Sequence, residues 1–304
     1  MSLDRKVVLI TRKTRYEELI AQYNTESQAA FVIESRGDSF SEYKQEHTRY
    51  VEAIFDTTKV IQQSCRLQTI DRAYLPNFIF GKDDIIVVIG QDGLVANTLK
   101  YLNGQSVIAI NPDPDRFDGK LLPFNVGEIK QVLHDVKLGR YSSTQITMAE
   151  ALLNDGQRLL AVNDLFIGPQ SQTSALYEIC IGGEREMQSS SGVIVSTGLG
   201  STGWLKSVIT GARSVLNIDN TESDSYSWDS DFLRYVVREP FPSNVTGTSL
   251  TFGVITRTES LQLASKMGQG GVIFSDGMLD DYLEFNSGSI ATIRTAKEQG
   301  NLVC

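Results

Sequence analysis

A short stretch at residues 87–95, VVIGQDGLV, passes from apolar residues into a polar turn that holds Asp92 between Gly90 and Gly93. If the residues before this turn form a strand, a glycine-rich turn leading into a helix offers its unpaired backbone amides to an anion. Ligands of parallel-sheet proteins bind at the carboxyl ends of the strands. The stretch therefore predicts either a ligand site into which Asp92 points, or an ordinary Asp-Gly turn in which Asp92 caps the next helix.

A second polar stretch, AINPDPDRFDGKLLPF at 109–124, carries four side chains with the oxygen atoms that calcium prefers: Asn111, Asp113, Asp115 and Asp118. A calcium loop of the EF-hand type needs a glycine where this chain has Arg116 and a bidentate glutamate where it has Leu122. We therefore predict no metal site here. The stretch is better explained as a loop that leaves the sheet edge beside Asp92.

A third region combines LLAVNDLFIG at 159–168 with SSSGVIVSTGLGSTGWLKS at 189–207. In the second segment a strand, 193–196, leads into a loop of glycines and hydroxyl residues and then into a helix that begins near Trp204. Glycines allow a ligand to approach the backbone, hydroxyls supply hydrogen bonds, and Trp204 offers a flat face to a base. The pair Asn163-Asp164 adds an amide and a carboxylate. The combination favours a nucleotide site, although each segment alone is also typical of a loop.

The chain has few histidines and cysteines that could act as catalytic bases, nucleophiles or metal ligands. The two histidines are His47 and His134, and the apolar spacing of EIKQVLHDVKL places His134 on the solvent side of a helix. The three cysteines are far apart and odd in number, which disfavours a disulfide framework or a zinc site.

The first part of the chain alternates between strand and helix patterns. Apolar runs predict strands at 6–11, 84–89 and 106–110, and helical spacing predicts helices at 14–23, 47–63 and 95–102. Such alternation is typical of a parallel sheet covered by helices. The carboxyl ends of these strands would then place the Asp92 turn at a ligand-binding edge.

The second part is dominated by strand patterns. Asp155-Gly156 and Gly182-Gly183 are hairpin signals, and short runs rich in Thr, Val and Ile follow between residues 249 and 294. The acidic, serine-rich stretch 217–231 is expected to be a solvated loop. We therefore predict two domains, an α/β nucleotide-binding domain at 1–115 and a mainly β domain at 116–304.

Composition narrows the class of partner. The chain has 304 residues, of which 41% are hydrophobic and 21% charged, and its net charge is −9. This charge disfavours nucleic acid as a partner, whereas a small anionic ligand can still be held by backbone amides. No apolar run is long enough for a membrane span, and residues 1–10 lack the order of a signal peptide, so we expect a cytoplasmic protein without membrane partners.

Taken together and in order, these stretches resemble the NAD kinase family, and its mitochondrial-type branch in particular. Gly90-Gln91-Asp92-Gly93 resembles the family's GGDG motif, Asn163-Asp164 its Asn-Glu pair, and 199–204 its TGSTAY-like loop. NPDP at 111–114, NDLFIG at 163–168 and SSGVIVSTGLG at 190–200 resemble segments of the mitochondrial-type branch, and 275–293 resembles the family's closing β segment.

The resemblance implies a fold, a reaction and a set of roles. The fold is an N-terminal α/β parallel-sheet domain followed by a mainly antiparallel β-sandwich domain, as in NAD kinases and diacylglycerol kinases. The reaction transfers a phosphoryl group from ATP, with Mg²⁺, to the 2′-hydroxyl of the adenosine ribose of NAD. Asp92 would be the catalytic base. The nucleotides would be held by Gly90, Gln91, Gly93, Asn111, Asn163, Asp164, Gly200, Ser201, Thr202, Gly203 and Trp204. The family also implies a homo-oligomer, a dimer or a tetramer.

Five positions depart from the family pattern, and two of them, Leu199 and Gly203, stand where threonine and alanine are usual. Gln91 replaces a glycine, Leu94 stands where a threonine is usual, and Asp164 is one carbon shorter than glutamate. Besides an NAD kinase, these departures leave open a catalytically weak protein that senses NAD(P) or ATP. A lipid or sugar kinase of the same superfamily is a further alternative, but the Asn163-Asp164 pair and Trp204 favour a nucleotide.

Overall fold

The computed structural model describes residues 5–218, 224–278 and 281–304, and the chain forms two compact units. Unit 1 comprises Met1–Ser143 and Asn301–Cys304, and unit 2 comprises Thr144–Gly300. Residues 116–143, which the sequence pattern assigned to the second domain, therefore fold with unit 1. Their helix packs against the strands of unit 1, and this contact is not visible in the local sequence.

Unit 1 is built on a parallel sheet, as predicted from the alternating pattern, and the strand order is β2-β1-β3-β4. The strands are β1 (Lys6–Thr11), β2 (Arg66–Asp71), β3 (Ile85–Ile89) and β4 (Ser106–Asn111). The short β5 (Phe124–Asn125) and the end of β17 (Ile290–Val303) also pair with β4 in parallel. Every residue of β3, IIVVI, is buried, because helices cover both faces of the sheet.

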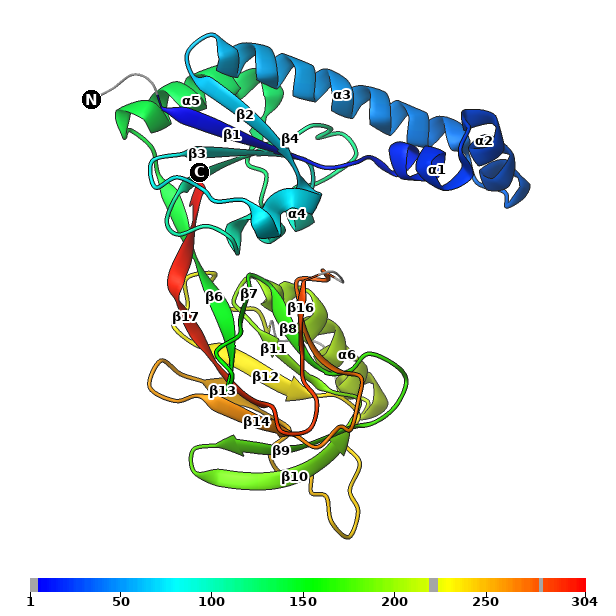
Figure 1. Ribbon diagram of the computed structural model, residues 1–304, viewed down its shortest axis with the longest axis vertical. Helices are drawn as coiled ribbons and strands as arrows, with labels where there is room; N and C mark the ends of the chain where they lie inside the picture. The colour runs from blue at the N-terminus through cyan, green and yellow to red at the C-terminus, as the bar shows by residue number, and fades with distance from the viewer. Residues whose placement is uncertain (1–4, 219–223, 279–280) are drawn as a thin grey trace. The chain divides into compact units, whose positions relative to one another are not determined.

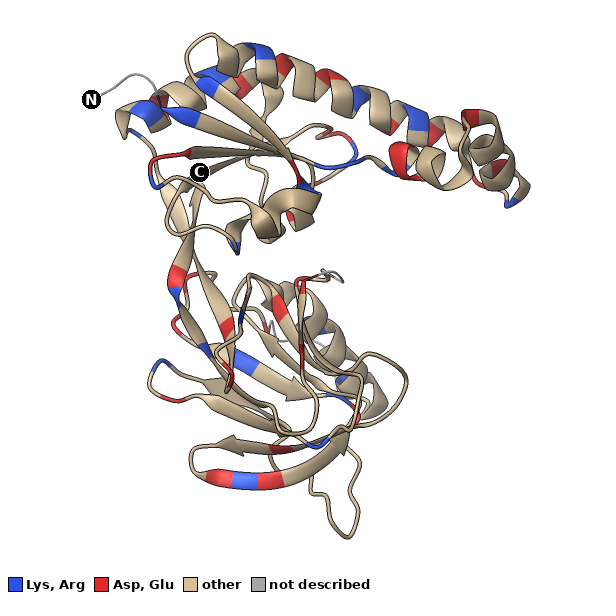
Figure 2. Ribbon diagram, in the orientation of Figure 1, with Lys and Arg blue, Asp and Glu red and all other residues tan. Residues whose placement is uncertain are grey.

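Helices cover the two faces of this sheet (Figure 1). Apolar residues of α3 (Phe40–Gln62) and α5 (Ile129–Leu138) form one core with alternate residues of the central strands. The short α4 (Asp92–Leu99) follows β3 and lies on the opposite face. His134 is exposed on α5, as its spacing predicted. Figure 2 shows acidic and basic residues interspersed along α3, which is typical of a solvated helix face.

A helix that the sequence pattern did not predict completes this region. α2 (Glu26–Ser35) packs with α1 (Arg15–Tyr23) and the first turn of α3 in a small apolar cluster around Ala29 and Phe40. α1 begins with a capping box, in which Thr14 accepts a hydrogen bond from the Glu17 amide and Glu17 accepts one from Thr14. Short 3-10 turns lie at η1 (Arg72–Asn77) and η2 (Val126–Glu128).

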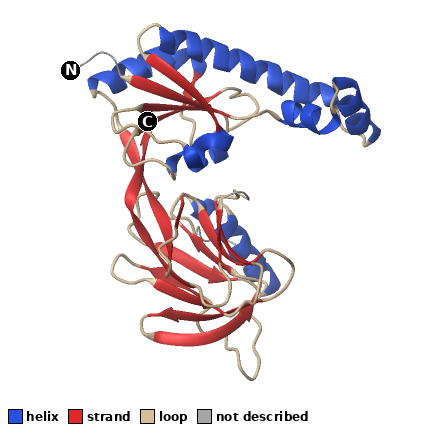
Figure 3. Ribbon diagram, viewed as in Figure 1, coloured by secondary structure: helices blue, strands red, loops and turns tan. Residues whose placement is uncertain are grey.

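Unit 2 is a sandwich of two mainly antiparallel layers (Figure 3). One layer has the order β10-β9-β14-β17, with β6 paired to β17 and β7 paired to β6, and the other has the order β13-β12-β11-β8-β15-β16. The strands are β6 (Ser143–Leu153), β7 (Arg158–Ala161), β8 (Asp164–Pro169), β9 (Ala175–Ile181), β10 (Glu184–Ser190), β11 (Val193–Ser196), β12 (Leu233–Val237), β13 (Phe252–Ile255), β14 (Leu261–Ser265), β15 (Gly271–Ser275) and β16 (Tyr282–Glu284).

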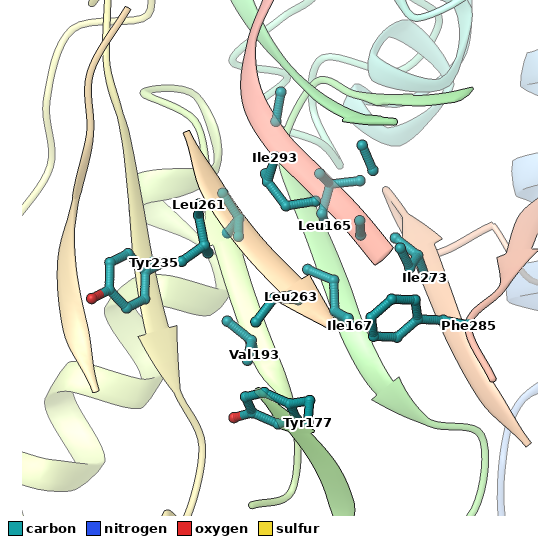
Figure 4. Packing of buried hydrophobic residues seen from close by; sticks show 14 of the residues in the cluster. Leu165, Ile167, Tyr177, Val193, Tyr235, Leu261, Leu263, Ile273, Phe285 and Ile293 are labelled. Atoms are coloured by element: carbon teal, nitrogen blue, oxygen red, sulfur yellow. The ribbon is translucent and has the colours of Figure 1, made fainter. Parts of the chain in front are cut away.

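The core of unit 2 is formed by residues that point inward from both layers, shown in Figure 4. Leu165, Val193 and Tyr235 come from one layer, and Leu263 and Ile293 from the other. The helix α6 (Trp204–Val215) packs on the outer face of β11 through Leu205. The expected α/β plus β-sandwich fold is thus confirmed. Of the acidic stretch 217–231, residues 219–223 lie outside the described part of the chain.

Candidate functional site

The turn between β3 and α4 holds the first group of predicted site residues. Gly90 has a φ of +157°, and a Cβ atom there would lie 2.9 Å from Cδ2 of Leu94. Gln91 has an ordinary extended backbone, with φ −123° and ψ 164°, so the chain tolerates glutamine where the family has glycine. Leu94 is buried against Gly90 and fills space rather than lining the turn.

Asp92 is the first residue of α4, and Gln91 is the capping position. The Asp92 carboxylate accepts hydrogen bonds from the backbone amides of Leu121, at 2.9 Å, and Lys120, at 3.2 Å. These bonds fix the carboxylate while leaving Asp92 partly exposed. The ordinary alternative, in which Asp92 caps the helix, is therefore not what the structure has, because the carboxylate binds a different segment.

Asn111 organises the loop that follows β4. Its Nδ2 donates to the carbonyl of Phe117, at 2.8 Å, and its Oδ1 accepts from the amide of Asp113, at 3.0 Å. The side chain is buried. Both polar groups of Asn111 are thus used within the loop that brings Lys120 and Leu121 to Asp92, so its predicted contact with a nucleotide would have to be indirect.

A buried tyrosine holds the strand ends of unit 1 in place. The Tyr50 hydroxyl on α3 accepts from the amide of Arg12, at 3.0 Å, and donates to the carbonyl of Ile89, at 3.0 Å. Burial raises the pKa of Tyr50 to about 12, so the hydroxyl keeps its proton. One phenol therefore joins the end of β1 to the residue that precedes the Gly90 turn.

The loop between β11 and α6 depends on close approaches that only glycine allows. A Cβ atom on Gly198 would lie 1.9 Å from the carbonyl oxygen of Ser227, and one on Gly200 would lie 2.2 Å from that of Asn163. The Ser201 hydroxyl donates to the Gly198 carbonyl, at 2.6 Å, and accepts from the Tyr226 amide, at 3.2 Å. Ser201 thus stabilises the loop, whereas the resemblance to NAD kinases implied that it contacts the ligand.

A pocket of about 380 Å³ lies beside this loop, entirely within unit 2. It is lined by Asn163, Asp164, Phe166, Leu199, Gly200, Thr202, Gly203, Trp204, Phe274, Asp276, Gly277 and Met278. Predicted residues from two distant segments therefore meet in one place. The volume is at the lower end of the range for small-molecule sites, so the pocket suits a nucleoside rather than a whole dinucleotide.

The aromatic wall of this pocket is held rigidly. The rings of Phe166 and Trp204 are stacked, with centroids 5.6 Å apart. Phe166 lies over Gly168 and Gly192, where Cβ atoms would come within 2.8 Å and 2.6 Å of its ring. The Arg238 guanidinium lies 5.6 Å from the Trp204 ring centroid, within range of a cation–π contact.

Asp164 is the unusual acid of the pocket. Burial raises its pKa to about 7; a hydrogen bond with the Ser196 hydroxyl acts against this, and the neighbouring charge of Asp276 adds to it. The side chain is partly exposed to the pocket, but its Oδ1 atom is buried and has no hydrogen-bond partner among the described residues. With this pKa, about half of the Asp164 carboxyl groups carry a proton near pH 7.

Asp276 is the second acid, and the sequence pattern did not single it out. Its carboxylate accepts from the backbone amides of Val162, at 2.9 Å, Asn163, at 2.6 Å, and Asp164, at 3.3 Å. The residue has a φ of +51° and lies in an Asp-Gly turn after β15, which is the one local signal that could have pointed to it. Asp276 fixes the backbone from which the Asn163 and Asp164 side chains project.

The site residues thus fall into two groups, each in its own unit. Gly90, Gln91, Asp92, Gly93 and Asn111 come together at the β3–α4 turn of unit 1. Asn163, Asp164, Gly200, Thr202, Gly203 and Trp204 come together at the pocket of unit 2, whereas Ser201 is buried in the adjoining loop and does not line the pocket. The helices among the described residues are too short or too polar to span a membrane.

Comparisons with known proteins find NAD kinases. The chain is 24% identical to "NAD kinase 2, mitochondrial" from Rattus norvegicus, over 96% of this chain and 85% of that protein. It is 25% identical to the protein of the same name from Homo sapiens, over 96% of this chain and 82% of the relative. No model of a protein family matches the chain.

Solved structures of NAD kinases share the fold. A yeast NADH kinase in complex with NADH superposes with a TM-score of 0.60 at 16% identity, covering 99% of this chain and 84% of that one. An NAD kinase from Archaeoglobus fulgidus in complex with ATP superposes with a TM-score of 0.58 at 15% identity, covering 99% of this chain and 93% of that one.

Proposed function

We propose, from the homology of this chain to NAD kinases, that it transfers the γ-phosphoryl group of MgATP to the 2′-hydroxyl of the adenosine ribose of NAD, which gives NADP and ADP. In this step a bond forms between the ribose oxygen and the γ-phosphorus, and the bond to the β–γ bridging oxygen breaks. Mg²⁺ enters with the ATP as part of the substrate. The single observation that carries the proposal is the fixed, partly exposed Asp92 carboxylate at the carboxyl end of β3.

The role proposed for Asp92 is to orient the 2′-hydroxyl and to accept its proton. Each carboxylate oxygen already accepts one backbone amide, which leaves a lone pair on each for the substrate. Because phosphoryl transfer has a loose transition state, the proton leaves late, and positioning contributes more than basicity. A carboxylate held by two amides suits that requirement.

The remaining residues are proposed to bind the two nucleotides. The first amides of α4 have no partner within the helix, so Gly90, Gln91 and Gly93 form a turn that can hold phosphate. The pocket of unit 2 offers Trp204 and Phe166 to a base and the Asn163 amide group to a polar edge. Asn111 and Ser201 would support these contacts by holding their loops.

The test is a paired measurement on the purified protein. NADP formation from NAD is followed with MgATP, with polyphosphate and Mg²⁺, and with NADH in place of NAD, while NAD binding is titrated by calorimetry. We expect binding and turnover with MgATP. Binding of NAD without any product, with every donor, would contradict the proposal.

A second candidate is a protein that binds NAD(P) or ATP and signals its level without catalysis. The observation that favours it is that Leu94 is buried, so the turn lacks the hydroxyl that a threonine would add to its phosphate side. Leu94→Thr separates the two. If the wild type is inactive and the variant gains turnover, the sensor is supported, whereas an active wild type removes the need for it.

Assembly and location complete the proposal. We propose a homo-oligomer, which light scattering of the purified protein tests. A cytoplasmic location is our expectation from composition, whereas both curated relatives carry a mitochondrial name. Fractionation of the source cells with an antibody to the protein decides between these locations.

A further inference from the structure

An arginine that the sequence pattern did not single out lies beside the turn that holds Asp92. Arg12 follows β1 directly, and β1 pairs in parallel with β3, the strand that precedes the turn. A Cβ atom on Gly90 would lie 3.9 Å from the Nε atom of Arg12. The Arg12 side chain therefore lies at the carboxyl ends of the strands, which is where ligands of parallel-sheet proteins bind.

The position of Arg12 relative to the turn is fixed by Tyr50. The Arg12 amide donates to the Tyr50 hydroxyl, which in turn donates to the carbonyl of Ile89, the residue before Gly90. The Arg12 guanidinium also lies 5.9 Å from the centroid of the Tyr50 ring, within range of a cation–π contact. Because the backbone and the side chain are both held, little ordering of Arg12 is needed when a ligand binds at the turn.

The Arg12 guanidinium uses only part of its hydrogen-bonding capacity within the protein. Nη2 donates to Oε1 of Glu46, at the long distance of 3.4 Å. Nε makes no hydrogen bond with the described residues and is enclosed, so a ligand cannot reach it. Nη1 also lacks a hydrogen-bond partner among the described residues, but it is not enclosed, and 17% of the side chain is exposed. Nη1 is therefore the nitrogen that a ligand can reach.

Glu46, the carboxylate that Arg12 contacts, does not depend on this arginine. Glu46 is buried on α3, and it also forms a short ion pair with Arg15 and a contact of 3.6 Å with Arg116. These two cations remain beside Glu46 when Arg12 binds a ligand. An anion at Arg12 therefore competes with a long, weak contact and does not leave a buried carboxylate without a partner.

We propose that Nη1 of Arg12 binds the terminal phosphates of the phosphoryl donor, ATP or inorganic polyphosphate, at the β3–α4 turn. The proposal rests on the proposed function, which supplies such a donor as the ligand. The backbone amides of the turn are neutral, and Mg²⁺ neutralises only part of the charge of the phosphate chain. A fixed guanidinium supplies the further positive charge that phosphoryl transfer requires, through charge-assisted hydrogen bonds to phosphate oxygens.

The experiment is a calorimetric titration of the full-length protein with MgATP, with tripolyphosphate and Mg²⁺, and with NAD. In Arg12→Gln we expect the affinity for the donor to fall about 10–100-fold, because one charge-assisted hydrogen bond is lost. The affinity for NAD should not change. A loss for MgATP identifies ATP as the donor that Arg12 holds, and a loss for tripolyphosphate alone identifies polyphosphate.

Lys13→Gln is the matched control, because it removes the same charge from the next residue, which is exposed. It should bind both donors as the wild type does. An equal loss in the two variants would overturn the proposal, since the loss would then reflect the general charge of the segment. Unchanged donor affinity in Arg12→Gln, or a wild type that binds neither donor, would overturn it as well. Lower thermal stability of Arg12→Gln with unchanged donor affinity would mean that Arg12 only supports the fold.

Two further outcomes separate this proposal from the proposed function. If the donor binds through Arg12 but no NADP forms, the phosphate contact stands and the kinase reaction fails. If NADP forms and Arg12→Gln keeps the wild-type kcat and KM for the donor, the reaction stands and the role of Arg12 fails. Should Arg12→Gln not fold, Arg12→Lys gives the same decision. Its single terminal nitrogen would be held by Glu46, so donor affinity should fall about tenfold, and wild-type affinity would refute the proposal.

Discussion

The β3–α4 turn of unit 1 and the β11–α6 loop of unit 2 have the same local design, a buried strand followed by glycines and a helix, but they treat their acids differently. In the first, the Asp92 carboxylate is fixed by two amides from a loop about 30 residues later and stays partly exposed. In the second, the Thr197 and Ser201 hydroxyls bond within the loop and to Val162, and beside it, at the start of β8, Oδ1 of Asp164 is buried without a hydrogen-bond partner among the described residues. The comparison shows that the glycines after a strand only allow backbone segments to come close together. The hydrogen bonds that each acid then receives determine whether its carboxylate is held in place and how readily it ionises.

The largest effect is expected from Asp92→Asn. The amide side chain cannot accept the ribose proton, so kcat should fall by about 10²–10⁴-fold while NAD affinity changes little. Steady-state NADP formation and calorimetry measure the two quantities. Asp118→Asn, an exposed acid of the neighbouring loop, is the control and should retain wild-type kcat. An equal loss in both variants would mean that Asp92 has no special role.

A smaller effect is expected from Asp164→Asn on stability. The folded-state pKa of Asp164 is raised from 3.8 to about 7, so the wild type loses stability as the pH rises from about 4 through 7. The variant, which has no proton to lose, should be more stable than the wild type at pH 8 by up to roughly 4 kcal/mol, since each pKa unit corresponds to about 1.4 kcal/mol. Thermal unfolding at pH 5 and pH 8 measures this. Equal pH dependence in the two proteins would show that Asp164 is ionised throughout.

Gly200→Ala tests the backbone approach in the second loop. Its Cβ atom would lie 2.2 Å from the Asn163 carbonyl, so the loop must shift, and we expect a loss of roughly 1–3 kcal/mol of stability together with weaker NAD binding. Gly211→Ala in α6 is the matched control, because nothing lies within 4 Å of its Cβ position. That variant should be slightly more stable than the wild type. Denaturant unfolding compares them, and identical midpoints for the two would refute the steric argument.

The smallest effect is expected from Tyr50→Phe, which tests how the first turn is held. Loss of the hydroxyl leaves the Arg12 amide and the Ile89 carbonyl without this partner, at a cost of roughly 1–2 kcal/mol. Hydrogen exchange should become faster at the Arg12 amide and change little in unit 2. Uniform acceleration over both units would instead indicate a general loss of stability.

The sequence predicted those parts of the fold that have a clear period. The strands at 6–11 and 85–89 and the helix starting at Trp204 follow from apolar runs and spacing, and the structure confirms them. Helix α2 was missed, because its apolar residues are consecutive rather than helically spaced and its stability comes from packing in the α1–α3 cluster. The predicted domain boundary was placed where the strand patterns become dominant, after residue 115. Residues 116–143 belong to unit 1 instead, because their contacts are with strands and helices far away in the sequence.

The site was predicted only as a set of residue types. Local motifs were enough to identify the Asp92 turn and the Asn163-Asp164 pair. They did not identify the backbone amides of Lys120 and Leu121 that hold Asp92, and they did not identify Asp276. The sequence also showed that Asp164 is shorter than glutamate without showing that its oxygen is buried. The hydrogen bonds involved join segments about 30 residues apart at Asp92 and more than 100 residues apart at Asp276, and no local pattern contains them.

The ring of Phe166, which lies on two glycines and supports Trp204, has a thermodynamic consequence for any ligand of this pocket. Because its wall has little torsional freedom to lose, the protein surrenders little entropy when a base stacks there. The affinity for a ligand should therefore depend on how well its ring stacks on Phe166 and Trp204 and bonds to Asp164. It should depend little on the free energy needed to order these side chains.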